Sequence, residues 1–233
     1  MRPSIERPAS YAAVNVDGTV NLLDAAVAYG CAKFLFVSSS SVYGNNEQVP
    51  FREDHPVDHP ISPYAATKKA GELICHSYWH LHRLPIFCLR LFTVFGPRQR
   101  PDLAISTFLH RIRDDQPITI YGDGSTSRDY TYINDIITGI LAALDRCDRY
   151  RLYNLGGNHP VSLTDLIHTL EHVTAKTAIT EQKPMQPGDV NRTWADLERS
   201  RAELDYKPKT TLADGVARQW AWMQDPHSKS PDH

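Results

Sequence analysis

The stretch KFLFVSSSSVYG, residues 33–44, decides the fold. Its first five residues, Lys33–Val37, form a short aromatic and aliphatic run without polar alternation, which is typical of a strand covered on both faces. The run Pro85–Phe92 has the same character. We therefore predict that both segments lie in a parallel sheet. The hydroxyl-rich residues after Val37 would then stand at the carboxyl edge of that sheet, where α/β folds place their ligands.

A helical pattern precedes each of these two strands. Residues 11–29 end at Gly30, and residues 63–81 follow Ser62, an expected N-cap, with Pro63 in the first turn. The order helix, strand, helix, strand predicts a doubly wound α/β sheet. Further along the chain we expect helices over 105–113, 133–144 and 162–172, and strands over 118–121 and 151–155.

The composition excludes several classes of protein. The 233 residues are 41% hydrophobic and 22% charged, as in folded globular chains rather than disordered or fibrous ones. The 25 Lys and Arg balance 27 Asp and Glu without a basic block, so we expect no nucleic-acid partner. The apolar run Ile136–Leu144 is far shorter than the roughly 20 residues that cross a bilayer. The beginning of the chain lacks the apolar core of a secretory signal, so we expect no membrane partner and a cytoplasmic location.

The cysteines and histidines give no sign of a metal site. The four cysteines show neither Cys-x-x-Cys spacing nor a disulfide framework, which predicts reduced and mostly buried thiols. They are Cys31, Cys75, Cys88 and Cys147. The 11 histidines show no paired metal-ligand spacing. We therefore expect no bound metal.

Two features carry candidate chemistry. The four hydroxyls of Ser38–Ser41 could bind a polar substrate, although a polar loop that merely ends the strand is an equal alternative. Tyr64 and Lys68 are four residues apart on a predicted helix, so they share one face, and the ammonium can favour an ionised phenol. Such a phenol can act as a general base. The spacing also occurs on solvated helix faces, so the pair alone is a weak signal.

Taken together, these residues resemble the active site of the short-chain dehydrogenase/reductase superfamily, in its extended, nucleotide-sugar-modifying branch. This branch is the NAD-dependent epimerase/dehydratase family. The likeness continues through most of the chain, and three of the segments that carry it are Asn15–Leu23, Ser62–Lys69 and Leu89–Pro97. It implies NAD as the cofactor and a UDP-sugar as the substrate.

The resemblance also implies a division of labour at the site. Tyr64 would take the proton from the sugar 4-hydroxyl, Ser39 would share that hydrogen bond, and Lys68 would support the phenolate and bind the nicotinamide ribose. Phe92 joins Tyr64 and Lys68 among the implied cofactor-binding residues. A 4-keto sugar would then turn over in the pocket and be reduced on its other face, which inverts one carbon.

Within this branch the chain is most similar to UDP-glucuronate 4-epimerases. Gly96–Asp102, Met185–Val190 and Tyr121–Asp135 carry this likeness, with Gln99 standing where a small residue is expected. A threonine and an arginine lie near the sugar carboxylate in that family, and a second arginine contacts the diphosphate. The implied substrate-binding residues are Ser39, Ser40, Ser41, Thr93, Arg100 and Arg128.

The role of the arginines has an alternative, and Ser41 bears on which reaction is implied. An arginine suits a carboxylate because it forms bidentate, charge-assisted hydrogen bonds. Arg98 and Arg100 could instead only solvate a loop. Related decarboxylases have a glutamate at the position of Ser41, so the serine favours epimerisation over decarboxylation.

One family feature is missing from the sequence. None of the 12 glycines forms a Gly-x-Gly-x-x-Gly turn ahead of the catalytic residues, and Met1 resembles a point after the family's fourth strand. We therefore expect an incomplete Rossmann-type doubly wound parallel sheet, with its first strands missing, and a smaller α/β substrate-binding region. The expected parts are 1–94 for the C-terminal half of the Rossmann domain, 95–225 mainly for substrate, with parts of 130–157 returning to the sheet, and 226–233 as a tail.

The missing turn leads to further expectations. The strand at Phe34–Val37 would present an open apolar edge, and the chain alone would bind NAD weakly and aggregate. A misplaced start codon and a true gene truncation are both open explanations. The implied activity is C4 epimerisation of UDP-glucuronate to UDP-galacturonate, impaired in this chain. The alternatives are another epimerase or dehydratase of the branch, or a non-catalytic remnant that binds a sugar nucleotide or dimerises. Helices 11–29 and 63–81 pair in family dimers, so a homodimer is also implied.

Overall fold

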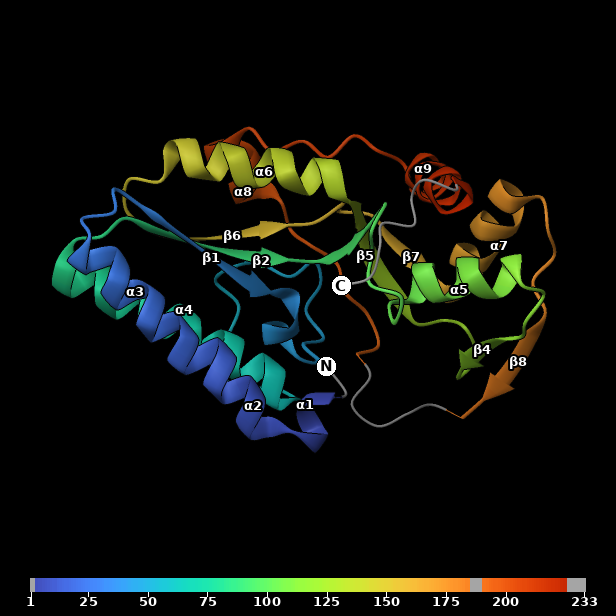
Figure 1. The fold of residues 1–233 in the computed structure, drawn as a ribbon, viewed down its shortest axis with the longest axis horizontal. Helices are drawn as coiled ribbons and strands as arrows, with labels where there is room; N and C mark the ends of the chain where they lie inside the picture. The colour runs from blue at the N-terminus through green and yellow to red at the C-terminus, as the bar shows by residue number, and fades with distance from the viewer. Residues whose placement is uncertain (1–2, 185–189, 226–233) are drawn as a thin grey trace.

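The computed structural model describes residues 3–184 and 190–225 (Figure 1). The main sheet contains β1 (Phe34–Ser39), β2 (Ile86–Leu91) and β6 (Tyr150–Leu155) in the order β1-β2-β6. All three strands are parallel, with Ser39, Leu91 and Leu155 in register at their carboxyl ends. The parallel α/β fold expected from the sequence is confirmed.

Helices cover both faces of this sheet (Figure 1). On one face lie α3 (Gly18–Ala28) and α4 (Pro63–His82), and on the other lie α6 (Ile133–Arg146) and α8 (Glu198–Leu204). The central strand β2 is buried along most of its length, whereas Val37 on β1 is 46% exposed. Within the described residues β1 pairs with β2 alone, so its outer edge has no strand neighbour there.

The predicted first helix is interrupted. It consists of α2 (Pro8–Ala12), a π-helical turn η1 (Ala13–Asp17) and α3, and it is preceded by the short α1 (Pro3–Glu6). The backbone N–H of Gly18 bonds to the carbonyl of Ala13, which is the i to i+5 spacing of a π turn. The expectation of one continuous helix was therefore wrong within this turn.

The second half of the chain forms two small sheets. One has the order β3-β5-β7, from Thr93–Phe95, Ser127–Tyr132 and Pro160–Ser162, and the other pairs β4 (Ile118–Tyr121) with β8 (Thr180–Lys183). The helices of this half are α5 (Ala104–Arg113), α7 (Leu163–Thr174) and α9 (Leu212–Gln224). Their apolar faces enclose a core of their own. The predicted helices 105–113 and 162–172 and the strand 118–121 are confirmed, whereas β5, β7, β8, α8 and α9 were not predicted.

A strap of extended chain, residues 190–196, joins the two halves. On one side the backbone N–H of Phe51 bonds to the carbonyl of Trp194 at 2.7 Å. On the other side Ser127 and Thr193 are joined through their backbone groups at 3.1 Å, and the N–H of Ala195 bonds to Asp129 at 2.9 Å. The strap therefore joins the segment at Phe51 to β5, and the side-chain amide of Asn154 on β6 donates to the strap's Asp196 carbonyl.

Some expectations fall outside the described residues. These are the tail 226–233 and most of the motif Met185–Val190, of which only Val190 is described. The helices of the described part include none that is both long and apolar enough to cross a membrane.

Candidate active site

The hydroxyl-rich loop stands at the carboxyl end of β1. Ser39 caps the short helix η2 (Ser40–Tyr43), because its Oγ accepts a hydrogen bond from the backbone N–H of Ser41 at 3.2 Å. The hydroxyls of Ser39 and Ser41 lie 3.1 Å apart. Ser38 is buried and donates to Glu72 at 2.6 Å, so its hydroxyl is used inside the protein and not at the sheet edge. The half-buried hydroxyls of Ser39, Ser40 and Ser41 are the ones that remain at the sheet edge.

Tyr64 is held in the first turn of α4. Ser62 caps this helix by accepting from the backbone N–H of Ala65 at 3.2 Å, as the sequence predicts. The backbone N–H of Tyr64 itself donates to Ser4 Oγ, and its ring meets that of Tyr11 edge to face at 6.0 Å. The start of the chain therefore packs directly against the candidate base.

Lys68 lies on the same helix face as Tyr64. Its Nζ is 6.0 Å from the centroid of the Tyr64 ring and donates to the carbonyl of Val37 at 2.9 Å. Burial lowers the pKa of Lys68. Ser39 and Tyr64 are not hydrogen-bonded to each other within the described residues. The ring of Phe92 is 4% exposed and lies among core aromatics, so its role at a cofactor stays a prediction.

A cavity of about 600 Å³ contains three of the six predicted substrate contacts, and Ser39, Ser40 and Ser41 are not among the residues that line it. Thr93, Arg100 and Arg128 line it together, although they come from three separate parts of the chain. Sequence reasoning missed Arg111 on α5 and Tyr121 on β4. Tyr121 begins a motif of the family likeness but was given no role there, and no local motif marks Arg111; the packing of α5 against β4 brings both to the cavity.

The cavity wall is positively charged. The ionised residues that line it are Arg100, Arg111, Arg128 and a single carboxylate, Asp102. Arg100 makes two hydrogen bonds to Asp102, at 3.0 and 2.8 Å. These bonds raise the pKa of Arg100. The three arginines outnumber the one carboxylate, so the wall suits an anionic ligand.

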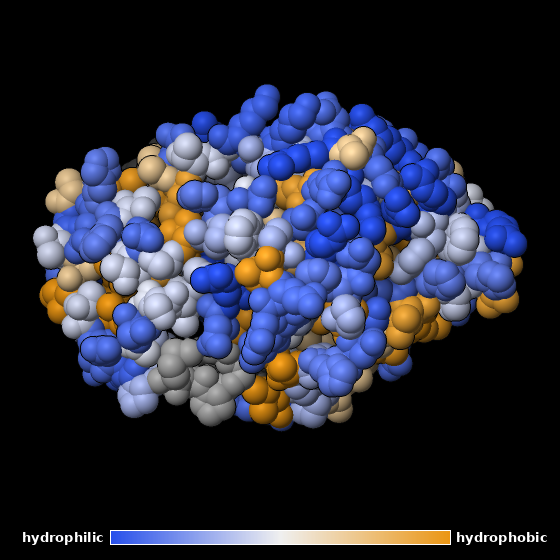
Figure 2. All heavy atoms as spheres, turned by 180° about the vertical axis from the view of Figure 1, so that it is seen from behind, coloured by the Kyte–Doolittle hydropathy of each residue, from blue (hydrophilic) through white to orange (hydrophobic). Residues whose placement is uncertain are grey.

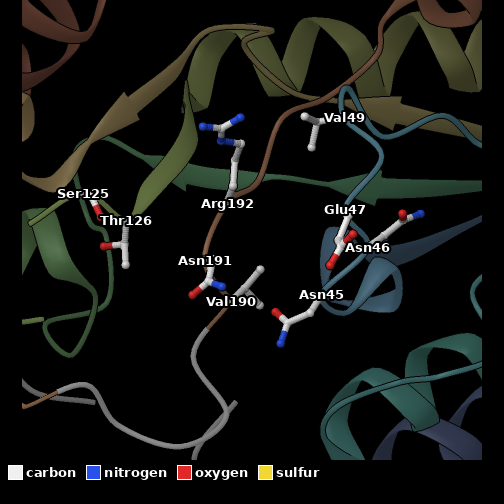
Figure 3. A pocket seen from close by; sticks show the side chains of 9 residues that line it. All are labelled: Asn45, Asn46, Glu47, Val49, Ser125, Thr126, Val190, Asn191 and Arg192. Carbon is white, nitrogen blue, oxygen red and sulfur yellow. The ribbon is translucent and has the colours of Figure 1, made fainter.

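A second cavity, of about 580 Å³, lies next to the first. Figure 3 shows its side chains, which come from three segments, 45–49, 125–126 and 190–192. Asn45, Glu47 and Arg192 make much of its wall polar. Thr126, the residue before β5, lines both cavities.

Fold and site together define a class of enzyme. A parallel sheet carries a hydroxyl-rich loop at its carboxyl edge, a Tyr-x-x-x-Lys pair lies on an adjacent helix, and an arginine-lined cavity is nearby. This is the arrangement of a short-chain dehydrogenase/reductase that acts on an anionic substrate.

Comparison with known proteins gives the family. The profile of the NAD dependent epimerase/dehydratase family matches residues 1–156. The UDP-glucuronate 4-epimerase of Thermodesulfobacterium geofontis is 40% identical over 226 residues, which cover 97% of this chain and 69% of that protein. This chain belongs to the NAD dependent epimerase/dehydratase family, as its sequence motifs indicate.

Solved structures are similar over most of the chain. UDP-glucuronic acid 4-epimerase from Bacillus cereus, in complex with UDP-glucuronic acid and NAD, has a TM-score of 0.87 and 38% identity. The match covers 91% of this chain and 68% of that one. UDP-glucose 4-epimerase from Thermotoga maritima, with UDP-glucose, has a TM-score of 0.91 and 30% identity over 96% of this chain and 73% of that one.

Proposed function

We propose that the protein epimerises UDP-glucuronate to UDP-galacturonate at C4, with NAD as its cofactor. The observation that carries this proposal is the cavity in which Thr93, Arg100 and Arg128 converge. Relatives that are named UDP-glucuronate 4-epimerases support the choice of substrate.

The residues of the site suit the nicotinamide end of NAD. Tyr64 and the half-buried Lys68 offer a phenol and an ammonium beside the carboxyl end of β1, and both can bind ribose hydroxyls. The printed sequence contains no glycine-rich turn ahead of them for the pyrophosphate. Bound NAD would supply reversible hydride transfer at the sugar C4.

The protein's own residues then have distinct tasks. Tyr64 accepts the proton of the sugar 4-hydroxyl and later gives it back, while Ser39 orients that hydroxyl. Lys68 favours the ionised phenol. Arg128 neutralises the diphosphate, and Arg100 holds the sugar carboxylate through a bidentate pair.

Holding the sugar carboxylate in place would also protect the 4-keto intermediate. A 4-keto glucuronic acid is a β-keto acid, which loses carbon dioxide when its carboxylate aligns with the ketone. Arg100 and Thr93 would hold the carboxylate away from that alignment. Ser41, where related decarboxylases have a glutamate, agrees with epimerisation.

Tyr64→Phe tests the proposal. We expect UDP-galacturonate formation to fall by at least about 10²-fold, because the proton acceptor is lost. Binding of UDP-glucuronate, measured by calorimetry, should change little. A wild-type protein without turnover would support the non-catalytic alternative. Release of carbon dioxide with a UDP-pentose product would contradict epimerisation.

We further propose that a second copy of the chain covers α3 and α4. Their outward faces expose Leu22, Tyr29, Leu73 and Leu81, each at least 60%. Figure 2 shows an apolar patch at the lower right, on the side of these helices, in a mainly hydrophilic surface. We also propose a cytoplasmic location, which four free cysteines support because reducing compartments keep thiols unpaired.

A further inference from the structure

The loop 96–103 joins β3 to α5 and carries Arg100. One side chain, Gln99, spans its base. The Nε2 of Gln99 donates to the carbonyl of Val94 before the loop at 2.9 Å, and its Oε1 accepts from the backbone N–H of Ser106 after the loop at 3.0 Å. Gln99 therefore fixes both ends of the segment that presents Arg100 to the cavity.

A second glutamine, on the C-terminal helix α9, completes this arrangement. Gln219 is 1% exposed, its Oε1 accepts from the backbone N–H of Gly96 at 3.0 Å, and its Nε2 donates to Gln99 Oε1 at 3.2 Å. The direction of each amide is determined by these partners, because an N–H requires an oxygen and a carbonyl requires an N–H. Neither amide can be reversed without leaving a buried donor facing a donor.

The backbone of Gly96, to which Gln219 is bonded, has little freedom to adjust. Gly96 has φ +142°, and a Cβ built there would lie 2.7 Å from the side chain of Ile133. None of the residues that line the arginine cavity belongs to α9. Gln99 itself lines the cavity, so Gln219 can influence a ligand there through its contacts with Gln99 and Gly96.

We propose that Gln99 and Gln219 are positioning residues that hold Arg100 where it can select an acidic sugar over a neutral one. The inference rests on the proposed function, in which Arg100 binds the sugar carboxylate. A bidentate pair needs its guanidinium within a fraction of an ångström of the right place, so a loosened loop weakens this contact most. Arg128 and Tyr121 line the cavity from other elements, so the proposed contact of Arg128 with the diphosphate should persist.

The test is the affinity of the protein for UDP, UDP-glucose and UDP-glucuronate, measured by calorimetry. Gln219→Met removes both amide contacts at similar volume. We expect it to weaken UDP-glucuronate about tenfold, with UDP and UDP-glucose within about twofold of the wild type. Gln224→Ala, on the exposed end of the same helix, is the matched control and should leave all three affinities unchanged.

Two further variants keep the test decisive. Gln99→Met should cause the same selective loss, and the double variant should lose no more than the larger single change, because the two glutamines act as one unit. Gln99 is only half-buried, so its variant provides the answer if Gln219→Met does not fold. Thermal unfolding identifies the folded variants.

The outcomes separate the two proposals. Unchanged discrimination in both variants, or an equal loss for all three ligands, would overturn the positioning role. A wild-type protein that binds UDP-glucose as tightly as UDP-glucuronate would overturn the substrate proposal, and the positioning role with it. Selective loss of the acidic sugar would establish the link from α9 to Arg100.

Discussion

Arg90 is a deeply buried cation beneath the candidate site. It is 1% exposed, and its Nε and Nη2 each donate to Glu72 at 2.8 Å. Burial alone would lower the pKa of Arg90, but the bonds to Glu72 raise it above its ordinary value. Since Glu72 lies one turn after Lys68 on α4, this ion pair fixes the catalytic helix to the central strand.

Breaking the pair from one side should be costly. Glu72→Gln leaves the Arg90 charge buried without its counter-charge, so we expect a loss of about 3–5 kcal/mol in the free energy of unfolding. Urea unfolding measures it. Glu198→Gln, whose side chain is 79% exposed, is the control and should cost less than about 1 kcal/mol. Equal losses in the two variants would contradict a structural role for the pair.

The residues of the candidate site differ in how well the sequence predicts their roles. Tyr64 and Lys68 could be predicted because an i, i+4 spacing on a helix is a local property. The sequence showed that Gln99 departs from the family pattern, but it did not predict the hydrogen bonds that this side chain makes. Its partner Gln219 lies 120 positions away, and only the packing of α9 against the loop brings the two amides together.

At the scale of elements, α4 reaches its close contact with β1 through a glycine. A Cβ at Gly71 would lie 2.3 Å from the Phe36 ring, whereas a Cβ at Gly18 on α3 would make an ordinary contact of 3.7 Å with the Ala13 carbonyl. Close packing therefore requires a glycine at position 71, whereas the space at position 18 would accept a methyl group.

The same substitution should have opposite effects at the two glycines. Gly71→Ala should destabilise by about 1–3 kcal/mol, because the ring must move. Gly18→Ala should stabilise by up to about 1 kcal/mol, because alanine loses less backbone entropy in a helix. Thermal unfolding compares them. A neutral Gly71→Ala would mean that α4 and β1 are less closely packed than described.

One carboxylate of the short helix α8 binds several residues of β6 and its leading residue Arg149. Glu203 accepts from Tyr153 Oη at 2.8 Å and from Arg149 at 3.0 Å, and it also pairs with Arg151. The Arg151 hydrogen bond is the largest of the effects that lower the pKa of Glu203 to about 2, against an ordinary value of 4.5.

This pKa sets a direction for the pH dependence. Because the folded-state pKa is depressed, the stabilisation is complete above pH 4.5 and is lost as the pH falls towards 2. Glu203→Gln should cost about 1–2 kcal/mol at pH 7 and much less at pH 2.5. Urea unfolding at both pH values checks this, and a cost that does not depend on pH would refute it.

Elements with strong hydrophobic signals were predictable, and β5 shows why others were not. Its inward residues include Ser127, Asp129 and Thr131, all buried and polar, so the strand has no alternating apolar pattern. Asp129 accepts three backbone N–H groups from Gly157, Asn158 and Ala195 instead. Burial nevertheless raises the pKa of Asp129 to about 6.

At the scale of the whole molecule, the two halves are joined by the strap 190–196 and share the candidate site. The sheet edge supplies Ser39, Tyr64 and Lys68, and the second half supplies Arg128. Neither half contains the whole constellation. The sequence indicated both sets of residues, but the strap's backbone bonds to Phe51 and Ser127 left no pattern to detect.

The proposed dimer makes a prediction at this scale. Leu22→Lys combined with Leu73→Lys places charges in the middle of the apolar faces of α3 and α4, so we expect a monomer in size-exclusion chromatography with light scattering. Ile179→Lys, on an exposed apolar residue elsewhere, is the control and should leave the wild-type mass unchanged. A double variant that is still dimeric would place the interface on another surface.

The π turn at Ala13–Asp17 restricts how the gene can vary. Such a turn is equivalent to one inserted residue, and deleting a single codon would restore regular α-helical winding. The helix before it would then rotate by about 100° and shift by about 1.5 Å. Ser4 and Tyr11, which hold Tyr64, would leave their places. Loss of three nucleotides here would therefore damage the candidate site, although this turn itself bears none of the proposed catalytic groups.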